Sequence, residues 1–394
     1  MRRAAIAERA GWRDIADAQG FTFHHDGGER YWDERACYVF TLEQIERGIE
    51  EPTVELHAMC LDLVADVVGS QEMMERLAIP AEHRDFVAAS WKANAPSLYG
   101  RFDFAYDGVG PAKLLEYNAD TPTSIYETGF FQWAWLEALI ADKRVPDGAD
   151  QFNSLHEKLI ARFGEIFAKG SFVHFTSVES EVEDRQTVRY LEDLARQAGL
   201  EPKFVAIDKI GIDADGKFVD EESFIVGAIF KLYPWEDLLR ERYADKLTGA
   251  GTLWLEPAWK AALSNKGMLP LLWDRHKGHP NLLPAFFDGD AAGKAELGNS
   301  YVRKPLFSRE GWDVELVDDG RRMKGRPAGY GEEGHVVQAL ARLPRMTGKY
   351  PVVGSWIVGA EAAGLSIRED RSRVTRNLSR FVPHVILDEG VEIS

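Results

Sequence analysis

The stretch that decides the fold is Arg101–Ser124, which reads RFDFAYDGVGPAKLLEYNADTPTS. Apolar and polar residues alternate in Arg101–Tyr106 and again in Lys113–Tyr117, with the period of two that is typical of strands. The residues between them, DGVGPA, include the glycines and the proline of a tight connection. This stretch therefore predicts a β-hairpin.

Polar side chains of this hairpin are predicted to gather on one face. Residues two apart on a strand share a face, so Arg101 lies beside Asp103 and Glu116 beside Asn118, while the aromatic residues between them point away. Two carboxylates and a carboxamide oxygen suit Mg²⁺, and an adjacent arginine suits the phosphates that this ion bridges. The alternative is the solvated face of an exposed hairpin.

The amino-acid composition excludes some classes of protein and favours others. The 394 residues suffice for two or three structural lobes, and 45% hydrophobic with 28% charged residues is typical of a globular chain. The 47 Lys and Arg residues against 64 Asp and Glu residues give a net charge of −17, which disfavours nucleic acid and anionic lipid and favours amines or bound metal. No run of about 18 apolar residues occurs. We expect a soluble cytoplasmic protein with no membrane or nucleic-acid partner.

The sequence lacks the motifs of several common classes of enzyme. Cys37 and Cys60 stand outside any zinc-binding spacing and are expected to be reduced and structural. The histidines do not cluster at metal-ligand spacing, which disfavours a zinc hydrolase. A Gly-x-Ser-x-Gly elbow is absent, so acyl-enzyme chemistry has no support.

Helical periodicity surrounds the hairpin on both sides. Val54–Val68 and the residues around Phe86–Ala93 indicate that the first hundred residues are mainly helical. After the hairpin, Ile125–Ala141 and Phe152–Phe167 show apolar helical patterns that are typical of core helices.

A small α/β lobe is predicted next. Strand Phe172–Ser177 precedes helix Asp184–Ala198, and strands Lys203–Ile207 and Phe224–Phe230 follow, separated by a polar hairpin at Asp213–Lys217. This alternation predicts a partly parallel sheet.

A third region begins near Gly251 and is predicted to contain a mixed sheet. Its predicted strands are Met268–Trp273, Tyr301–Lys304, Tyr350–Val358 and a segment near Ile367. The glycine-rich stretch Pro327–Gly334 is expected to be a loop.

Three basic residues in this region are candidates for phosphate binding. Lys304 lies on a predicted strand just before Ser308–Gly311, a segment that could close over bound nucleotide as a lid. Lys266 and Arg368 are weaker candidates, because single basic residues are often part of the surface.

Several motifs together resemble the synthetase part of the glutathionylspermidine synthase family. They are Arg101–Asp103, Leu115–Ser124, Gln132–Glu137, Glu183-Asp184, Lys231–Glu236, Lys266, Val302–Pro305, Ser308–Gly311 and Thr347–Tyr350. The resemblance spans nearly the whole chain. It implies a mixed α/β fold of the ATP-grasp type in permuted order, with a helical N-terminal region and a small Rossmann-like pre-ATP-grasp lobe.

We accordingly expect one synthetase unit over residues 1–394, with four approximate lobes. These are a helical N-terminal region at 1–100, the metal hairpin and core helices at 101–169, an α/β substrate lobe at 170–250 and an ATP-grasp nucleotide lobe at 251–394. The Cys/His amidase domain of the bifunctional members has no counterpart in this sequence, so we expect no hydrolytic half-reaction.

The resemblance also implies an activity and a set of site residues. The family joins a peptide carboxylate, such as that of glutathione, to an amine, such as a polyamine, through an acyl phosphate and at the expense of ATP. Carried over by position, Asp103, Glu116 and Asn118 would hold Mg²⁺, and Arg101 would contact the γ-phosphate and stabilise acyl-phosphate formation. The implied nucleotide contacts are Lys266, Lys304, Glu310, Gln338, Ala339, Leu340, Ala341 and Arg368. The implied contacts to the peptide are Thr121, Glu183, Asp184 and Leu232.

Two alternatives stay open on the sequence alone. Leu232 stands where the family has a polar contact, so the acid need not be glutathione. An ATPase or carboxylate kinase, or a regulatory nucleotide-binding protein without ligase activity, would share the same fold. The oligomeric state and the identity of both substrates are left open.

Overall fold

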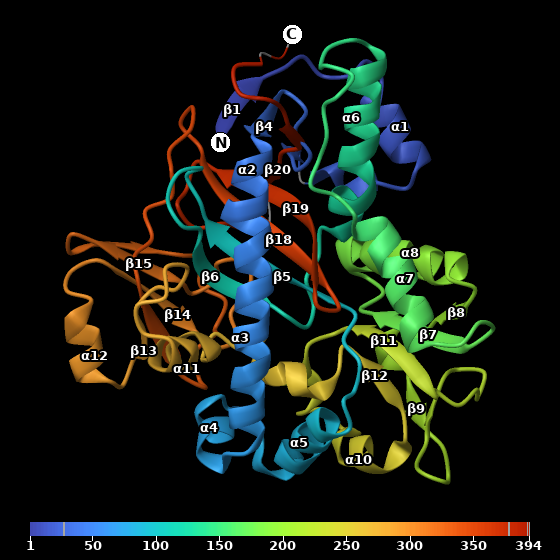
Figure 1. Ribbon diagram of the computed structural model, residues 1–394. Helices are drawn as coiled ribbons and strands as arrows, with labels where there is room; N and C mark the ends of the chain where they lie inside the picture. The colour runs from blue at the N-terminus through green and yellow to red at the C-terminus, as the bar shows by residue number, and fades with distance from the viewer. Residues whose placement is uncertain (27, 377–378, 392, 394) are drawn as a thin grey trace.

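The computed structural model describes residues 1–26, 28–376, 379–391 and 393 of the chain. Within these residues the fold is mixed α/β, with three larger sheets and several short ones. Figure 1 shows the long helix α3 (Glu51–Val68) crossing in front of the middle sheet, with a second sheet on its left and the α/β lobe on its right. Both ends of the chain lie toward the top of this view.

The central sheet is antiparallel and joins the predicted hairpin to the end of the chain. Its strands, in order across the sheet, are β20 (Arg380–Phe381), β19 (Glu361–Asp370), β18 (Tyr350–Val358), β5 (Tyr99–Ala105) and β6 (Lys113–Asn118). The register sets Arg101 opposite Asn118 and Asp103 opposite Glu116. The hairpin prediction is therefore confirmed, and so is the expected convergence of its polar residues.

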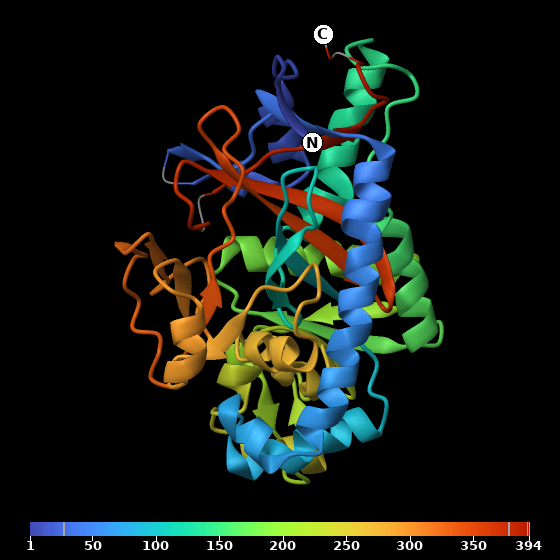
Figure 2. The ribbon, with the colours of Figure 1, turned by 60° about the vertical axis from the view of Figure 1, so that its left-hand side comes forward.

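The opposite face of the hairpin is hydrophobic core. Phe102 and Tyr117 are buried and stack with ring centroids 3.8 Å apart. Helix α3 packs along this sheet through its contacts with β18 and β19, as the turned view in Figure 2 also shows. Burial of each large apolar side chain contributes about 2 kcal/mol, so this face fixes the orientation of the polar one.

The α/β lobe has a wholly parallel sheet, where the sequence predicted a partly parallel one. Its strands, in order, are β12 (Leu253–Leu255), β11 (Ala228–Leu232), β7 (Phe172–Ser177) and β8 (Glu201–Phe204). Helices α7 (Leu155–Ile166) and α8 (Val182–Gln197) pack beside it. Because α8 begins just beyond the carboxyl end of β7, its first turn lies at the edge of a parallel sheet where ligands commonly bind.

The third sheet is antiparallel and contains the phosphate-site lysine predicted from the sequence. Its strands, in order, are β13 (Ala285–Phe287), β17 (His335–Ala339), β14 (Tyr301–Pro305), β15 (Glu315–Asp318) and β16 (Arg321–Lys324). Pro327–Gly334 is outside helices and strands, as expected of a loop.

The strand predicted at Met268–Trp273 is wrong. These residues form helix α11 (Met268–Arg275), and Pro270 falls in its first turn, where proline is tolerated. A short run of apolar residues fits a buried strand and a buried helix equally well, so its periodicity could not separate the two.

The N-terminal region is less helical than predicted. It contains α4 (Gln71–Arg76) and α5 (Arg84–Lys92) next to α3, but also strands β1 (Arg2–Ala5) and β4 (Ala36–Phe40). Strand β4 pairs antiparallel with β1 and parallel with β21 (His384–Ile386). Because half of this pairing comes from the far end of the chain, no local pattern could reveal it.

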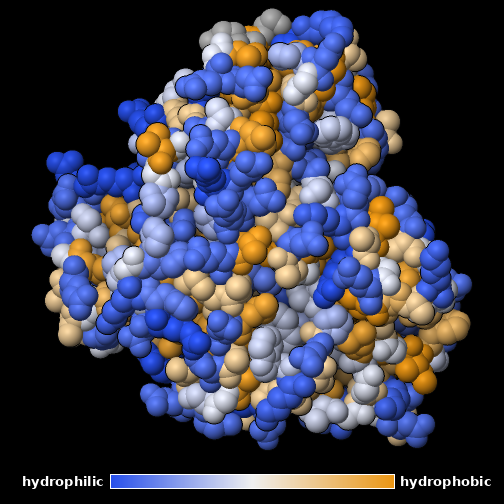
Figure 3. Space-filling model, viewed as in Figure 1, coloured by the Kyte–Doolittle hydropathy of each residue, from blue (hydrophilic) through white to orange (hydrophobic). Residues whose placement is uncertain are grey.

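No helix among the described residues is long and apolar enough to cross a membrane. On the face seen in Figure 3 hydrophilic residues predominate, and hydrophobic ones occur in small groups. This face therefore offers no broad apolar surface.

Candidate active site

The predicted site residues surround one cavity of about 1020 Å³. It lies where the polar face of the hairpin, the α/β lobe and the third sheet meet. Its lining includes every residue carried over from the family: Arg101, Asp103, Glu116, Asn118, Thr121, Glu183, Asp184, Leu232, Lys266, Lys304, Glu310, Gln338, Ala339, Leu340, Ala341 and Arg368. Residues more than 250 positions apart in the sequence are thus brought to one space.

On the hairpin wall, four polar side chains form a connected network. Arg101 donates from Nε to Asp103 Oδ1 over 2.7 Å and from Nη1 to the carbonyl of Thr123 over 2.8 Å. The Asn118 amide donates to Asp103 Oδ2 over 3.0 Å and to Glu116 Oε1 over 3.5 Å. These hydrogen bonds hold both carboxylates on one side of the sheet.

The charges on this wall are balanced by lysines from the third region. Lys266 Nζ lies 3.2 Å from Glu116 Oε2. Burial raises the pKa of Glu116, but Lys266 and Lys304 outweigh it and lower that pKa to about 2. Burial raises the pKa of Asp103 and outweighs Arg101, which lowers it. Glu116 is thus an anion throughout the physiological range.

Lys304 is buried on β14 and reaches back to the hairpin. Its Nζ donates to the carbonyl of Leu115 and to Gln338 Oε1, both over 2.8 Å. Gln338 in turn donates to the carbonyl of Leu114 over 3.0 Å. Burial lowers the pKa of Lys304 to about 8, and Glu116 counteracts this. These contacts join the end of β17, where the predicted nucleotide contacts Gln338–Ala341 begin, to the hairpin.

The donor set fits Mg²⁺ bound together with phosphates. The described residues hold no group of three or more His, Cys, Asp or Glu that could bind a metal by itself. Mg²⁺ commonly takes one or two carboxylates, several waters and oxygens of substrate phosphates. Asp103, Glu116 and the Asn118 carbonyl oxygen match that pattern, with three basic side chains nearby for the phosphates.

The segment Ser308–Gly311, which we call the lid loop, lines the cavity. The carbonyl of Ser308 accepts a hydrogen bond from Lys266 Nζ. Arg309 forms an ion pair with Glu236 of α9 (Trp235–Leu238), with 2.9 Å between Nη2 and Oε1. Gly311 has φ +70° and a Cβ there would lie 2.4 Å from the carbonyl oxygen of Thr375, so only glycine fits. The lid loop therefore connects Lys266 to the α/β lobe.

One wall of the cavity is strongly acidic. This acidic wall consists of Glu181, Glu183, Asp184, Glu236, Asp237 and Glu310. Burial and the neighbouring Glu183 raise the pKa of Asp184 to about 7, and burial raises the pKa of Glu310. Arg309 is paired with Glu236, so the wall keeps an excess of carboxylates that favours a cationic ligand.

Sequence reasoning missed one wall of the cavity. Thr22, Phe23, His25 and Tyr31 all line it, although no chemistry was assigned to the first hundred residues. The aromatic and histidine-rich stretch FTFHH was the available signal, but nothing local placed it near the hairpin. Trp235 of α9 does not line the cavity: it is fully buried and donates its indole N–H to the carbonyl of Glu256 over 3.1 Å.

Comparison with known proteins identifies the family. The sequence profile described as "Glutathionylspermidine synthase preATP-grasp" matches residues 3–387. The chain belongs to the glutathionylspermidine synthase family. The resemblance inferred from the hairpin and lysine motifs is therefore confirmed.

Three relatives illustrate the range of this family. A putative acid–amine ligase of Haemophilus influenzae is 39% identical over 378 residues, covering 93% of this chain and 94% of that protein. Trypanothione synthetase of Crithidia fasciculata is 31% identical, covering 82% of this chain and 52% of that protein. The bifunctional glutathionylspermidine synthetase/amidase of Escherichia coli is 27% identical, covering 95% and 63%. The chain thus spans about half to two thirds of the two longer relatives.

Membership of the glutathionylspermidine synthase family makes the chain an acid–amine ligase, an enzyme that forms a C–N bond. Family membership also implies the use of ATP.

Proposed function

We propose that the protein joins the carboxylate of a peptide-like acid, such as glutathione, to an amine of the polyamine class through an acyl phosphate, on an ATP-grasp scaffold. The observation that carries this proposal is the meeting in one cavity of the hairpin network, the two lysines and the acidic wall. Phosphate-binding groups on one side and cation-binding groups on the other are what such a ligation requires.

Charge placement supports the phosphoryl-transfer step. A carboxylate does not condense with an amine in water, so it must first accept the γ-phosphoryl group of ATP. Lys266 and Lys304 would hold the phosphates, and Arg101 would neutralise charge that develops on the transferred group. Asp103, Glu116 and Asn118 would hold Mg²⁺, which supplies charge neutralisation between phosphates.

Exclusion of water is the second requirement. An acyl phosphate hydrolyses when water reaches it, so the cavity must be closed while it exists. The Arg309–Glu236 pair and the Lys266 contact to Ser308 support a role of the lid loop in this closure.

The acidic wall supports the assignment of the substrates. Glu183 and Asp184 lie in the first turn of α8 and could bind the ammonium group of a peptide, with Thr121 and Leu232 nearby. The remaining carboxylates of the wall favour an amine that carries more than one positive charge.

A substrate panel tests the proposal. Purified protein with Mg²⁺ and ATP is assayed for ADP release against pairs of acids and amines, including glutathione and spermidine, and products are identified by mass spectrometry. We expect ADP release that requires both substrates and an amide product of the pair. ADP release without any amide product would instead indicate an ATPase or carboxylate kinase, and the absence of nucleotide binding would contradict the assignment of the cavity.

A further inference from the structure

A buried acid lies next to the cavity and takes no part in the proposed binding of phosphate or metal. Glu127 belongs to the short helix η4 (Glu127–Phe131) and is 1% exposed. The hydroxyl of Tyr31 donates to Glu127 Oε1 over 2.5 Å and lies 2.9 Å from the hydroxyl oxygen of Ser124. Tyr31 itself lines the cavity, so this buried carboxylate contacts a residue of the cavity wall.

The second oxygen of this carboxylate has no partner among the residues that the structure describes. A buried carboxylate with an unpaired oxygen is costly when charged, so it favours the protonated form. Burial, with a smaller effect of Glu183, raises the pKa of Glu127 to about 7. A group that exchanges a proton near pH 7 is suited to general base catalysis.

Three side chains from other segments act on Glu127. Tyr31 lies on the N-terminal segment, Glu183 on α8 and Arg368 on β19. Tyr126 precedes Glu127 in the chain, and burial and Glu127 raise the pKa of its hydroxyl. Glu183 raises the pKa of Glu127, whereas Arg368 and the Tyr31 hydrogen bond lower it. The guanidinium carbon of Arg368 also lies 5.1 Å from the centre of the Tyr31 ring.

Tyr31 is held firmly on both sides along the chain. Before it, Arg30 contacts Glu8 and lies 3.6 Å from Asp33. After it, Trp32 stacks on Phe381 with centroids 5.3 Å apart.

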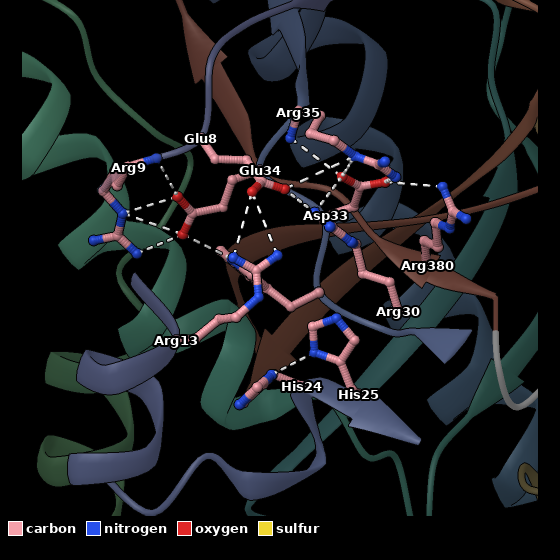
Figure 4. Close-up of polar contacts among 11 residues, drawn as sticks. Glu8, Arg9, Arg13, His24, His25, Arg30, Asp33, Glu34, Arg35 and Arg380 are labelled. Atoms are coloured by element: carbon pink, nitrogen blue, oxygen red, sulfur yellow. Dashed lines mark hydrogen bonds and ion pairs between the residues drawn. The ribbon is translucent and has the colours of Figure 1, made fainter. Parts of the chain in front are cut away.

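Further ion pairs fix the residues that follow. Arg9 pairs with Glu34 over 2.6 Å, and Asp33 accepts from Arg35 over 2.7 Å and from Arg380 over 3.0 Å (Figure 4). Such surroundings keep a functional side chain in one position.

We propose that Tyr31 and Glu127 form a proton relay that deprotonates the amine substrate; this inference rests on the proposed ligation. The Tyr31 hydroxyl passes its proton to Glu127 Oε1 as its oxygen takes a proton from the substrate ammonium. The free amine then attacks the acyl carbon, a C–N bond forms, and the C–O bond to phosphate breaks with its electron pair leaving on phosphate. The second proton of the nitrogen goes to the departing phosphate, and Glu127 returns its proton through Tyr31 to solvent.

In this scheme Tyr31 contacts the amine and is the catalytic residue, whereas Glu127 acts through it. Ser124 positions the hydroxyl: its φ of +70° is rare for a residue with a side chain, and its hydroxyl lies within hydrogen-bond distance of Tyr31.

A comparison of two nucleophiles, hydroxylamine and spermidine, distinguishes removal of the proton from the other steps of the ligation. Hydroxylamine is largely unprotonated at pH 7 and needs no base, whereas spermidine must lose a proton. The acid used is the one from which the wild-type protein forms the most hydroxamate, and glutathione is tested first. With this acid, Glu127→Gln and Tyr31→Phe should each slow amide formation with spermidine by about 10²-fold. Hydroxamate formation should stay at the wild-type rate. The rise of the spermidine rate around pH 7 should also disappear in Glu127→Gln.

Tyr126→Phe is the matched control, because it removes a buried hydroxyl that has no hydrogen-bond partner among the described residues and belongs to a residue outside the cavity lining. It should leave both rates unchanged. Equal losses with both nucleophiles in the two relay variants, or no loss with spermidine, would overturn the relay. A wild-type protein that forms no hydroxamate with any acid would contradict the proposed function, and the relay with it.

A readout without substrates completes the test. In protein labelled with ¹³C at the glutamate carboxyl carbons, one resonance should titrate near pH 7 and be absent from Glu127→Gln. Absence of that resonance from the wild-type spectrum would also overturn the relay.

Discussion

Glu116 contacts both halves of the proposed phosphate site. It lies opposite Asp103 on the hairpin and forms an ion pair with Lys266. Its low pKa makes it the carboxylate of the pair that is always charged, so it is the stronger proposed ligand of a divalent ion.

Replacing this one charge should therefore disable phosphoryl transfer. We expect Glu116→Gln to reduce acid-dependent ADP formation by about 10² or more, because an electrostatic group at the reaction centre is lost. Steady-state kinetics at several Mg²⁺ concentrations would measure this. A fully active variant would contradict the placement of the ion at the hairpin.

Glu127 should also leave a signature on stability. Because its pKa is about 7 in the folded protein and the ordinary value is 4.5, the folded state binds its proton more tightly than the unfolded state. Its contribution is therefore fully present below pH 4.5 and is lost as the pH rises to about 7.

Glutamine does not titrate, so the Glu127→Gln protein should not become less stable in this way as the pH rises. The unfolding free energy of the variant relative to wild type should increase by about 3 kcal/mol between pH 4.5 and pH 8. Denaturant unfolding at a series of pH values measures the difference. A difference that does not vary with pH would show that Glu127 keeps its ordinary pKa.

At the scale of elements, the lid loop depends on a glycine that cannot be replaced. A Cβ at Gly311 would lie 2.4 Å from the carbonyl oxygen of Thr375 and 2.6 Å from a methyl carbon of Val374, so Gly311→Ala must displace the loop. We expect more ATP hydrolysed per amide formed, because water would reach the acyl phosphate. The ratio of ADP to amide measures this coupling.

Gly320→Ala is its control. Gly320 has a similar φ of +76° in the turn between β15 and β16, but nothing lies within 4 Å of its Cβ position. This variant should carry the same backbone strain and keep the wild-type ratio. Equal ratios in both variants would remove the lid loop from the closure of the cavity.

Elements stabilised by local patterns were predicted well from the sequence. The alternation in β5 and β6 gave the hairpin, and the bounds predicted for Phe172–Ser177 and Tyr350–Val358 are those of β7 and β18. Strands β1 and β4 depend on distant partners and were missed, because β4 also pairs with β21. Helix α11 was taken for a strand for another reason, since a short apolar run fits both structures.

Site residues were likewise predicted where sequence motifs identify them and missed where they depend on distant contacts. The family motifs placed one residue after another around the cavity, but the wall that contains His25 and Tyr31 was missed. In that wall the N-terminal segment lies against the end of the chain, through contacts such as the ion pair of Arg380 with Asp33 and the stacking of Trp32 on Phe381. Sequence spacing carries no information about such a contact.

At the scale of the whole molecule, one buried ion pair joins the hairpin motif to the α/β lobe. Lys231 of β11 lies 2.6 Å from Asp120, and both are buried. Asp120 also accepts a hydrogen bond from the backbone amide of Trp235 over 2.8 Å. Asp120 directly precedes Thr121 of the cavity wall, so this pair positions the proposed substrate side relative to the phosphate side.

Removing one partner of this ion pair should lower the free energy of unfolding of the protein. Lys231→Met leaves a buried carboxylate without its cation, and we expect a loss of about 3–5 kcal/mol in unfolding free energy. Lys143→Met, at the exposed pair with Asp147, should change stability little. Denaturant unfolding compares the two, and equal effects would mean that the Asp120–Lys231 pair does not connect the lobes energetically.

The fate of the carboxylate oxygens tests the acyl-phosphate mechanism most directly. An acid labelled with ¹⁸O in its carboxylate, incubated with the protein, ATP, Mg²⁺ and an accepted amine, should transfer one ¹⁸O atom to each phosphate released. This transfer is required when the carboxylate attacks the γ-phosphoryl group and the amine then displaces phosphate at the acyl carbon. Amide formation accompanied by phosphate that carries no ¹⁸O would contradict it.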